Sequence, residues 1–130
     1  MAEFSSDLTA SGSSERALGT IASGTSGTIG FGLCFTNDTA LSASNFLISY
    51  TGEQWRNGGS GNSNTLTFWY RVSASVITNP EPAVLAGWTQ VTPLNFATPT
   101  VSVSTTALDG NQTTNRNFFT ALTIPGHNAE

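Results

Sequence analysis

The residues best suited to chemistry gather in one short stretch, the EQWR sequence at positions 53–56. A glycosidase needs only two carboxyl groups flanking a cleft. Glu53 is the best candidate for one of them, with Asp109 or Asp38 as a conceivable partner. This stretch is therefore the first place to look for a hydrolase.

The alternative for Glu53 is a structural ion pair with Arg56 or Arg16, which would hold the loop. The other catalytic sets are poorly represented. A Ser-His-Asp triad or a zinc site would have to use His127, the only histidine, or Cys34, the only cysteine. We interpret Cys34 as a buried, inert small hydrophobe. We therefore expect no catalytic residues and no enzyme activity.

Carbohydrate binding fits these residue types better than catalysis does. Sugars present apolar C–H faces ringed by hydroxyl groups, so their sites combine aromatic rings with amide, carboxylate and guanidinium groups. Trp69 and Arg71 alternate with Phe68 and Tyr70, so the first two should share one face of a strand. Burial in the core is the alternative for each tryptophan. The candidate ligand-binding residues are Trp55, Arg56, Gln54, Asn57, Trp69 and Arg71.

The charge balance limits the other partners. Four arginines, no lysine and eight acidic residues give a net charge of −4 at pH 7. This balance disfavours the phosphate backbone of a nucleic acid. No apolar run approaches the length of a membrane span, so we expect no membrane insertion. We expect no cofactor; the hard oxygen ligands that a structural calcium ion prefers are offered by Asp38 and by the turn at 109–111.

Two strands are predicted around the EQWR sequence, within residues 45–73. Phe46, Ile48 and Tyr50 alternate with polar or smaller residues, and residues 65–73 continue in the same way after a loop rich in glycine and asparagine. Period-two alternation is typical of strands with one face in a core. We therefore predict a central strand pair, with EQWR at the turn between the two strands.

The rest of the chain predicts further short strands and no amphipathic helix. In residues 28–37 the apolar side chains alternate with small ones, which indicates that another element packs closely there. Turns rich in glycine, proline, asparagine and aspartate separate the segments. The other predicted strands are 15–22, one ending at 76–77, 88–91, one around 101–103, and 117–124.

This organisation predicts an all-β fold in one domain. Only 9% of the residues are charged, and serine, threonine, glycine and asparagine fill the polar positions, which suits the solvent face of a β-sheet. About seven short strands favour an antiparallel β-sandwich, of either the jelly-roll or the immunoglobulin-like type. We assign residues 1–14 to an N-terminal arm or linker and residues 15–130 to the domain.

Five short motifs are spread along the chain. They are ERALG at 15–19, GFGL at 30–33, ISYTGEQWRNGG at 48–59, LTF at 66–68 and ALDGN at 107–111. Together they resemble a family of bacterial extracellular β-sandwich modules that occur within large secreted or surface proteins. The resemblance implies an extracellular or cell-surface location and a function in carbohydrate binding or adhesion, with a polysaccharide or surface glycan as partner.

Members of that family typically continue with a tryptophan-containing strand, an acidic turn and a final strand rich in histidine, glycine and aspartate. Against that pattern, one or two C-terminal strands are expected to be lacking, which would leave an unpaired sheet edge. The alternative function is therefore a structural subunit that self-assembles with identical subunits, as a filament or oligomer, by β-strand complementation.

Overall fold

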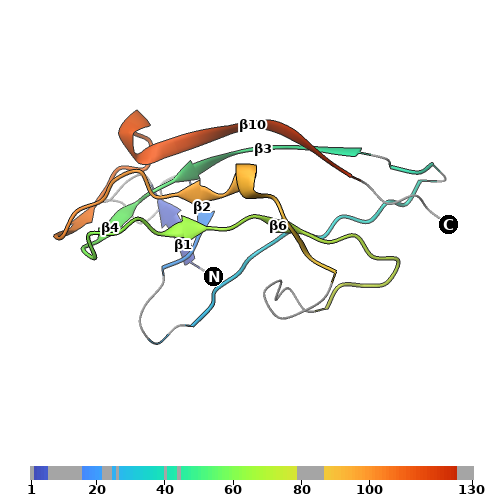
Figure 1. Ribbon diagram of the computed structural model, residues 1–130, viewed down its shortest axis with the longest axis horizontal. Helices are drawn as coiled ribbons and strands as arrows, with labels where there is room; N and C mark the ends of the chain where they lie inside the picture. The colour runs from blue at the N-terminus through green and yellow to red at the C-terminus, as the bar shows by residue number, and fades with distance from the viewer. Residues whose placement is uncertain are drawn as a thin grey trace.

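The computed structural model describes residues 2–5, 16–21, 25, 27–39, 41–43, 45–78 and 87–125. Every strand pair among them is antiparallel and the only helical elements are two short 3-10 turns, so the all-β prediction is confirmed (Figure 1). The strands are β1 (Ala2–Ser5), β2 (Arg16–Gly19), β3 (Asn45–Glu53), β4 (Arg56–Gly58), β5 (Thr65–Leu66), β6 (Trp69–Tyr70), β7 (Thr89–Gln90), β8 (Phe96–Ala97), β9 (Thr105–Ala107) and β10 (Arg116–Pro125). The 3-10 turns are η1 (Thr92–Leu94) and η2 (Thr113–Asn115).

The strands from β3 onward pair in a nested order. β3 pairs with β10, β4 with β9, β5 with β8 and β6 with β7. Backbone hydrogen bonds continue the ladder between these pairs. The amide of Leu108 donates to the carbonyl of Trp55 over 2.9 Å, and the amide of Val91 donates to the carbonyl of Phe68 over 3.0 Å. Residues 45–70 and 89–125 therefore run side by side as one long antiparallel ribbon.

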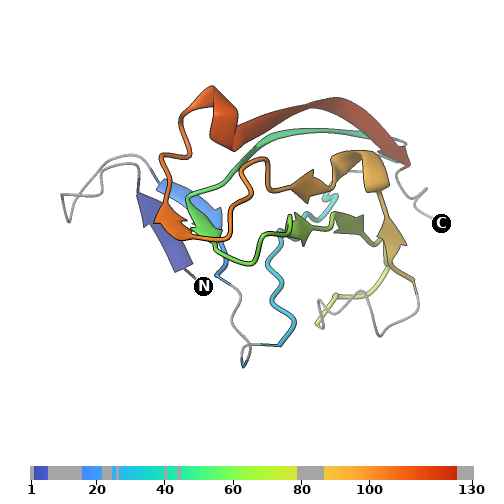
Figure 2. The ribbon, with the colours of Figure 1, turned by 60° about the vertical axis from the view of Figure 1, so that its left-hand side comes forward.

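The ribbon bends back so that its two ends lie over one another. In Figures 1 and 2, β3 and β10 run along one side, and the stretch that contains β6 and β8 crosses beneath them. Aromatic rings fill the space between. The ring of Tyr50 stacks on Phe119 at 4.6 Å and on Phe68 at 6.1 Å between centroids, and Phe96 meets Phe119 edge-on. Leu94, only 1% exposed, completes this core.

One polar group enters this core. The hydroxyl of Tyr50 donates a hydrogen bond to the backbone carbonyl of Leu94, and burial raises the pKa of the Tyr50 phenol. The described strands form five two-stranded sheets rather than two continuous ones. The complete β-sandwich therefore stays a prediction.

The predicted central strand pair is wrong. β3 begins where the predicted stretch begins, at Asn45, but it pairs with β10 over a long register that runs from Arg116 opposite Glu53 to Pro125 opposite Asn45. The second predicted strand is broken into β5 and β6, because the amide of Phe68 donates to the side chain of Asn95 instead of to a neighbouring strand. The EQWR sequence is therefore not a hairpin turn.

The strand predicted at 28–37 is also wrong. Residues 27–38 pair with no other strand in the described part of the chain. Leu33 is 80% exposed and Phe35 is 77% exposed. Cys34 is exposed as well, so its predicted burial is wrong. Alternation of apolar and small residues is not sufficient here, because a strand also needs a sheet edge beside it.

The remaining predicted strands are recovered to different degrees. The strand at 117–124 is confirmed by β10, and the segments 88–91 and 15–22 contain β7 and β2. The strand expected around 101–103 is displaced to β9, and none ends at 76–77. Part of the predicted N-terminal arm forms β1, which pairs with β2. His127 lies outside the described residues.

Candidate functional site

The EQWR sequence forms the passage from β3 to β4. Glu53 ends β3 and Arg56 begins β4. Between them, the amide of Gln54 donates to the carbonyl of Asn115 over 2.8 Å, so the backbone stays in the ribbon. The opposite half of the chain contains extra residues here, because its loop at 108–115 faces only two residues, 54 and 55. The EQWR residues therefore pack beneath the loop at 108–115.

Gln54, a predicted ligand residue, is buried and its amide is fully engaged. Only 5% of it is exposed. Its Nε2 donates to the carbonyl of Thr100 over 2.8 Å and to the carbonyl of Arg56 over 3.2 Å, and its Oε1 accepts from the amide of Thr100 over 2.8 Å. The side chain thus pairs with Thr100 as a neighbouring strand would, and it fastens that part of the chain to the EQWR sequence.

Asn57 has a similar role further along the ribbon. It is buried in β4, and its Nδ2 donates to the carbonyl oxygens of Ser102 and Ser104, over 3.0 and 2.7 Å. An amide that satisfies backbone carbonyls in this way contributes to the fold. Releasing it to a ligand would remove a hydrogen bond from both carbonyls, and that of Ser102 would keep only the bond from the amide of Gly61.

Trp55 and Glu53 interact directly. The indole Nε1 of Trp55 donates to Oε2 of Glu53 over 3.1 Å. The indole covers Gly110, where a Cβ atom would lie 2.5 Å from Cε2 of Trp55. Among the described side chains, Glu53 forms no ion pair with Arg56, so that predicted pair is wrong. The side chain of Arg16 lies outside the described residues.

The turn predicted at 109–111 is present, and its carboxylate stabilises it. Oδ2 of Asp109 accepts from Nε2 of Gln112 over 3.1 Å, and Oδ1 accepts from the amide of Asn111 over 2.9 Å. The bond from Gln112, the bond from Asn111 and the charge of Arg116 lower the pKa of Asp109. The described residues contain no cluster of three acidic, histidine or cysteine side chains. Calcium binding at Asp109 or Asp38 stays a prediction.

We expect the Asp109→Asn variant to be less stable than the wild type at neutral pH and equally stable in acid. Because folding lowers the pKa of Asp109, its ionised carboxylate stabilises the fold above the ordinary pKa of about 3.9. That contribution disappears as the pH falls through the lower pKa of the folded state. Urea unfolding from pH 7 to pH 2 measures it. The Gln112→Ala control should lose only part of the wild type's change in unfolding free energy with pH. If the unfolding free energies of Asp109→Asn and the wild type change with pH in the same way, the assignment is contradicted.

Trp69 and Arg71 lie at the far end of the ribbon. Trp69 is directly opposite Gln90, and the same register places Arg71 opposite Trp88. All four side chains are half-buried. Nε1 of Trp69 donates to Oγ1 of Thr67 over 2.9 Å, whereas the buried Nε1 of Trp88 has no hydrogen-bond partner among the described residues. The predicted pair thus shares its face of the ribbon with a second tryptophan and an amide.

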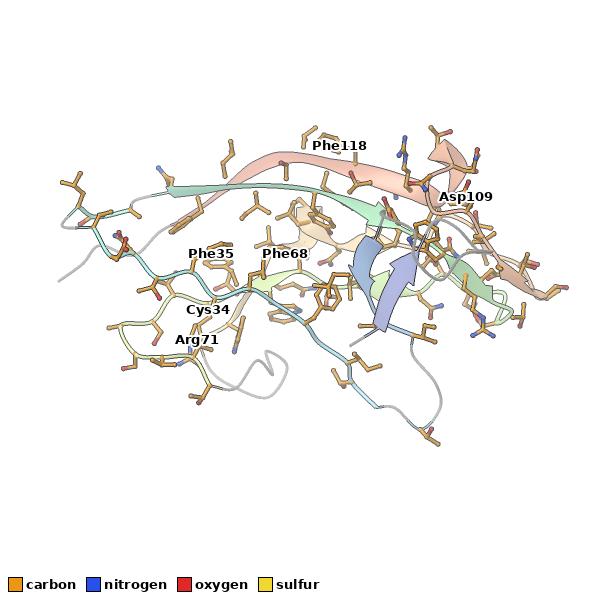
Figure 3. All side chains as sticks on the ribbon, turned by 180° about the vertical axis from the view of Figure 1, so that it is seen from behind. Cys34, Phe35, Phe68, Arg71, Asp109 and Phe118 are labelled. Carbon is orange, nitrogen blue, oxygen red and sulfur yellow. The ribbon has the colours of Figure 1, made fainter. Side chains whose placement is uncertain are left out.

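An open hollow of about 430 Å³ lies on the outer face of β3 and β10. Phe118, which is 68% exposed, stands directly opposite Thr51 in the register, and Arg116 stands opposite Glu53. Phe118 points away from the core ring of Phe68 (Figure 3). The guanidinium group of Arg116 is exposed and forms no hydrogen bond with a described residue. The hollow is lined by Thr51, Thr113, Arg116 and Phe118.

None of these four residues was predicted as a ligand residue. One partial signal was available: Phe118 lies in the last predicted strand, 117–124, and Arg116 stands two residues before it, just outside the predicted bounds, at the spacing that puts a cation and an aromatic ring on one face. The pairing of that strand with β3, which adds Thr51 to the hollow, has no local signal in the sequence.

Comparisons with family models, with curated proteins and with solved structures give no match to this chain. The resemblance to extracellular β-sandwich modules therefore stays a prediction. Among the described residues, no helix is long and apolar enough to cross a membrane.

Proposed function

We propose that this protein is a non-catalytic extracellular module that binds carbohydrate, and that the hollow on the outer face of β3 and β10 is its binding site. The observation that carries the proposal is the chemistry of the lining. An exposed phenyl ring, an exposed guanidinium group and two threonine hydroxyls surround a space of about 430 Å³. Small-ligand sites usually measure roughly 300–1,000 Å³.

Each lining group has a partner on a sugar ring. The apolar C–H face of the sugar packs on Phe118, and its hydroxyls accept hydrogen bonds from Arg116 and exchange them with Thr51 and Thr113. Trp55 does not line the hollow; it is linked to this part of β3 by its hydrogen bond to Glu53, which lies opposite Arg116. The extracellular location rests on the sequence resemblance alone.

The other predicted ligand residues contribute less to this proposal. Gln54 and Asn57 are buried, and their amides already bind backbone groups. Arg56 is exposed on β4 and remains accessible. Trp69 and Arg71 are half-buried at the other end of the ribbon and would form a separate contact.

Affinity electrophoresis against a panel of polysaccharides, followed by calorimetry on the best glycan, tests the proposal. We expect Phe118→Ala and Arg116→Gln each to weaken binding roughly ten-fold or more, because each removes one of the main contacts. Leu41→Ala is the control, since that apolar side chain is similarly exposed and lies outside the hollow. If no glycan retards the wild type, or if all three variants bind alike, the proposal fails.

A second candidate function is that of a self-assembling structural subunit. Large apolar side chains are widely exposed on the described residues, whereas Leu94 and Phe96 are the only apolar ones among them that are buried. Covering apolar surface contributes about 25 cal/mol per Å². A second copy would supply such a cover. Sedimentation velocity measures this self-association. A mass that increases with protein concentration supports assembly, and a monomer at every concentration excludes it.

A further inference from the structure

We propose that residues 28–36 pair with the same residues of a second copy of this chain, as antiparallel strands with the two Gly32 residues opposite one another. The inference deepens the second candidate function and rests on it, and it is independent of glycan binding. It names the segment that joins two subunits and the register in which they join.

The first observation is that this segment is extended and unpaired, and that its side chains are exposed except for the half-buried Phe31. Residues 27–38 belong to no strand pair, and no backbone hydrogen bond joins residues 28–36 to another described residue. Figure 3 shows Cys34 and Phe35 on this extended stretch. Backbone N–H and C=O groups in a β-prone segment are a ready template for another strand. The segment is therefore available for strand pairing.

The second observation is the absence of charge. No charged residue occurs between Arg16 and Asp38. By contrast, β3, β4 and β10 each carry a charge, at Glu53, Arg56 and Arg116. Charges on exposed strands oppose pairing with another chain. Pairing of this segment with the same residues of a second copy therefore brings no like charges together, which makes a second copy a compatible partner.

The third observation fixes the register. With Gly32 opposite Gly32, Ile29 faces Phe35 of the second copy and Phe31 faces Leu33, so all four apolar residues of each copy have an apolar partner. Aromatic and β-branched residues are favourable cross-strand pairs. A shift of one residue would bring the apolar face of one strand against the small-residue face of the other. Centring the pair on Leu33 would instead place Ile29 opposite Asn37.

The same register places Gly30 opposite Cys34 of the second copy. Directly opposite residues of an antiparallel pair have Cα atoms about 4.5–5.5 Å apart, which suits a disulfide. The two Cys34 residues would instead be offset by four positions, roughly 13 Å along the strand, which is too far. A cysteine introduced by Gly30→Cys would therefore form a disulfide with Cys34 of the second copy only in this register.

The experiment treats the Gly30→Cys variant with diamide, which takes up the two protons and two electrons lost when two thiols form a disulfide. We expect a disulfide-linked dimer whose peptide map joins residue 30 of one copy to residue 34 of the other. The wild type and the Gly30→Cys/Cys34→Ser variant should form no disulfide-linked dimer. A dimer in sedimentation without the 30–34 link would overturn this inference and leave assembly standing. A monomer would overturn both.

A second variant tests the pairing without any cross-link. A Cβ added at Gly32 meets nothing within 4 Å, so the position has room for a side chain to begin. Gly32→Asp would bring two like charges together at the centre of the pair, and we expect it to raise the dimer dissociation constant at least ten-fold. Gly32→Asn is the uncharged control and should have a much smaller effect. Equal dissociation constants for wild type and Gly32→Asp would overturn the inference.

Discussion

The Gln54→Ala variant is expected to lose about 2–3 kcal/mol of unfolding free energy. In the wild type, the Gln54 side chain accepts a hydrogen bond from the amide of Thr100 and donates one to its carbonyl, as the backbone of a neighbouring strand would. Alanine removes both bonds and leaves backbone groups without partners in a place that water reaches poorly. Urea unfolding followed by tryptophan fluorescence measures the change.

Asn62→Ala is the matched control for this variant. Asn62 is an exposed amide whose hydrogen bonds stay with Ser60, so its loss should change stability by less than about 0.5 kcal/mol. Equal stability of the two variants, combined with weaker glycan binding by Gln54→Ala, would contradict the structural role. It would return Gln54 to the set of ligand residues.

The Gly52→Ala variant is expected to be destabilised by about 1–3 kcal/mol. A Cβ at this position would lie 2.3 Å from Cδ2 of Phe96 and 2.9 Å from its Cε2. The ring of Phe96 is buried and meets Phe119 edge-on, so it has little room to move. Thermal and urea unfolding measure the loss.

Gly58→Ala is the control for the change of residue type. Gly58 also lies in a strand, but a Cβ there meets nothing within 4 Å. We expect its stability to stay the same or to rise by up to about 1 kcal/mol, because alanine restricts the unfolded chain. If Gly52→Ala is as stable as Gly58→Ala, the close contact between Gly52 and Phe96 does not exist in solution.

The sequence predicted well those elements whose pattern is local. The position of β3 and most of β10 follow from alternation and from the turns beside them, although Glu53, predicted in a turn, belongs to β3. Their pairing with each other could not be predicted, because it depends on the nested order of the whole ribbon. The segment 28–37 shows the same limit, since its alternation resembles that of β3 and only the absence of a described neighbour distinguishes it.

The candidate site was predicted only partially, for a related reason. Gln54 and Asn57 are plausible ligand residues because amides bind sugars, but amides also bind backbone carbonyls, and residue type does not separate the two roles. Burial separates them, and burial depends on where residues 100–104 pass. Arg116 and Phe118 were open to prediction as an exposed pair, yet the hydroxyls beside them come from other segments of the chain.

The nested pairing also determines how the molecule responds to force. Asn45 and Pro125 are register partners at the open end of the ribbon. Because antiparallel hydrogen bonds run perpendicular to the strands, tension that separates these two residues acts along the bonds and loads them one after another. The hydrogen bonds of such a ribbon break one after another, first between β3 and β10 and last between β6 and β7. Shear forces directed along the strand axes would instead load many bonds at once. Mechanical strength in this protein therefore depends on the direction of the load.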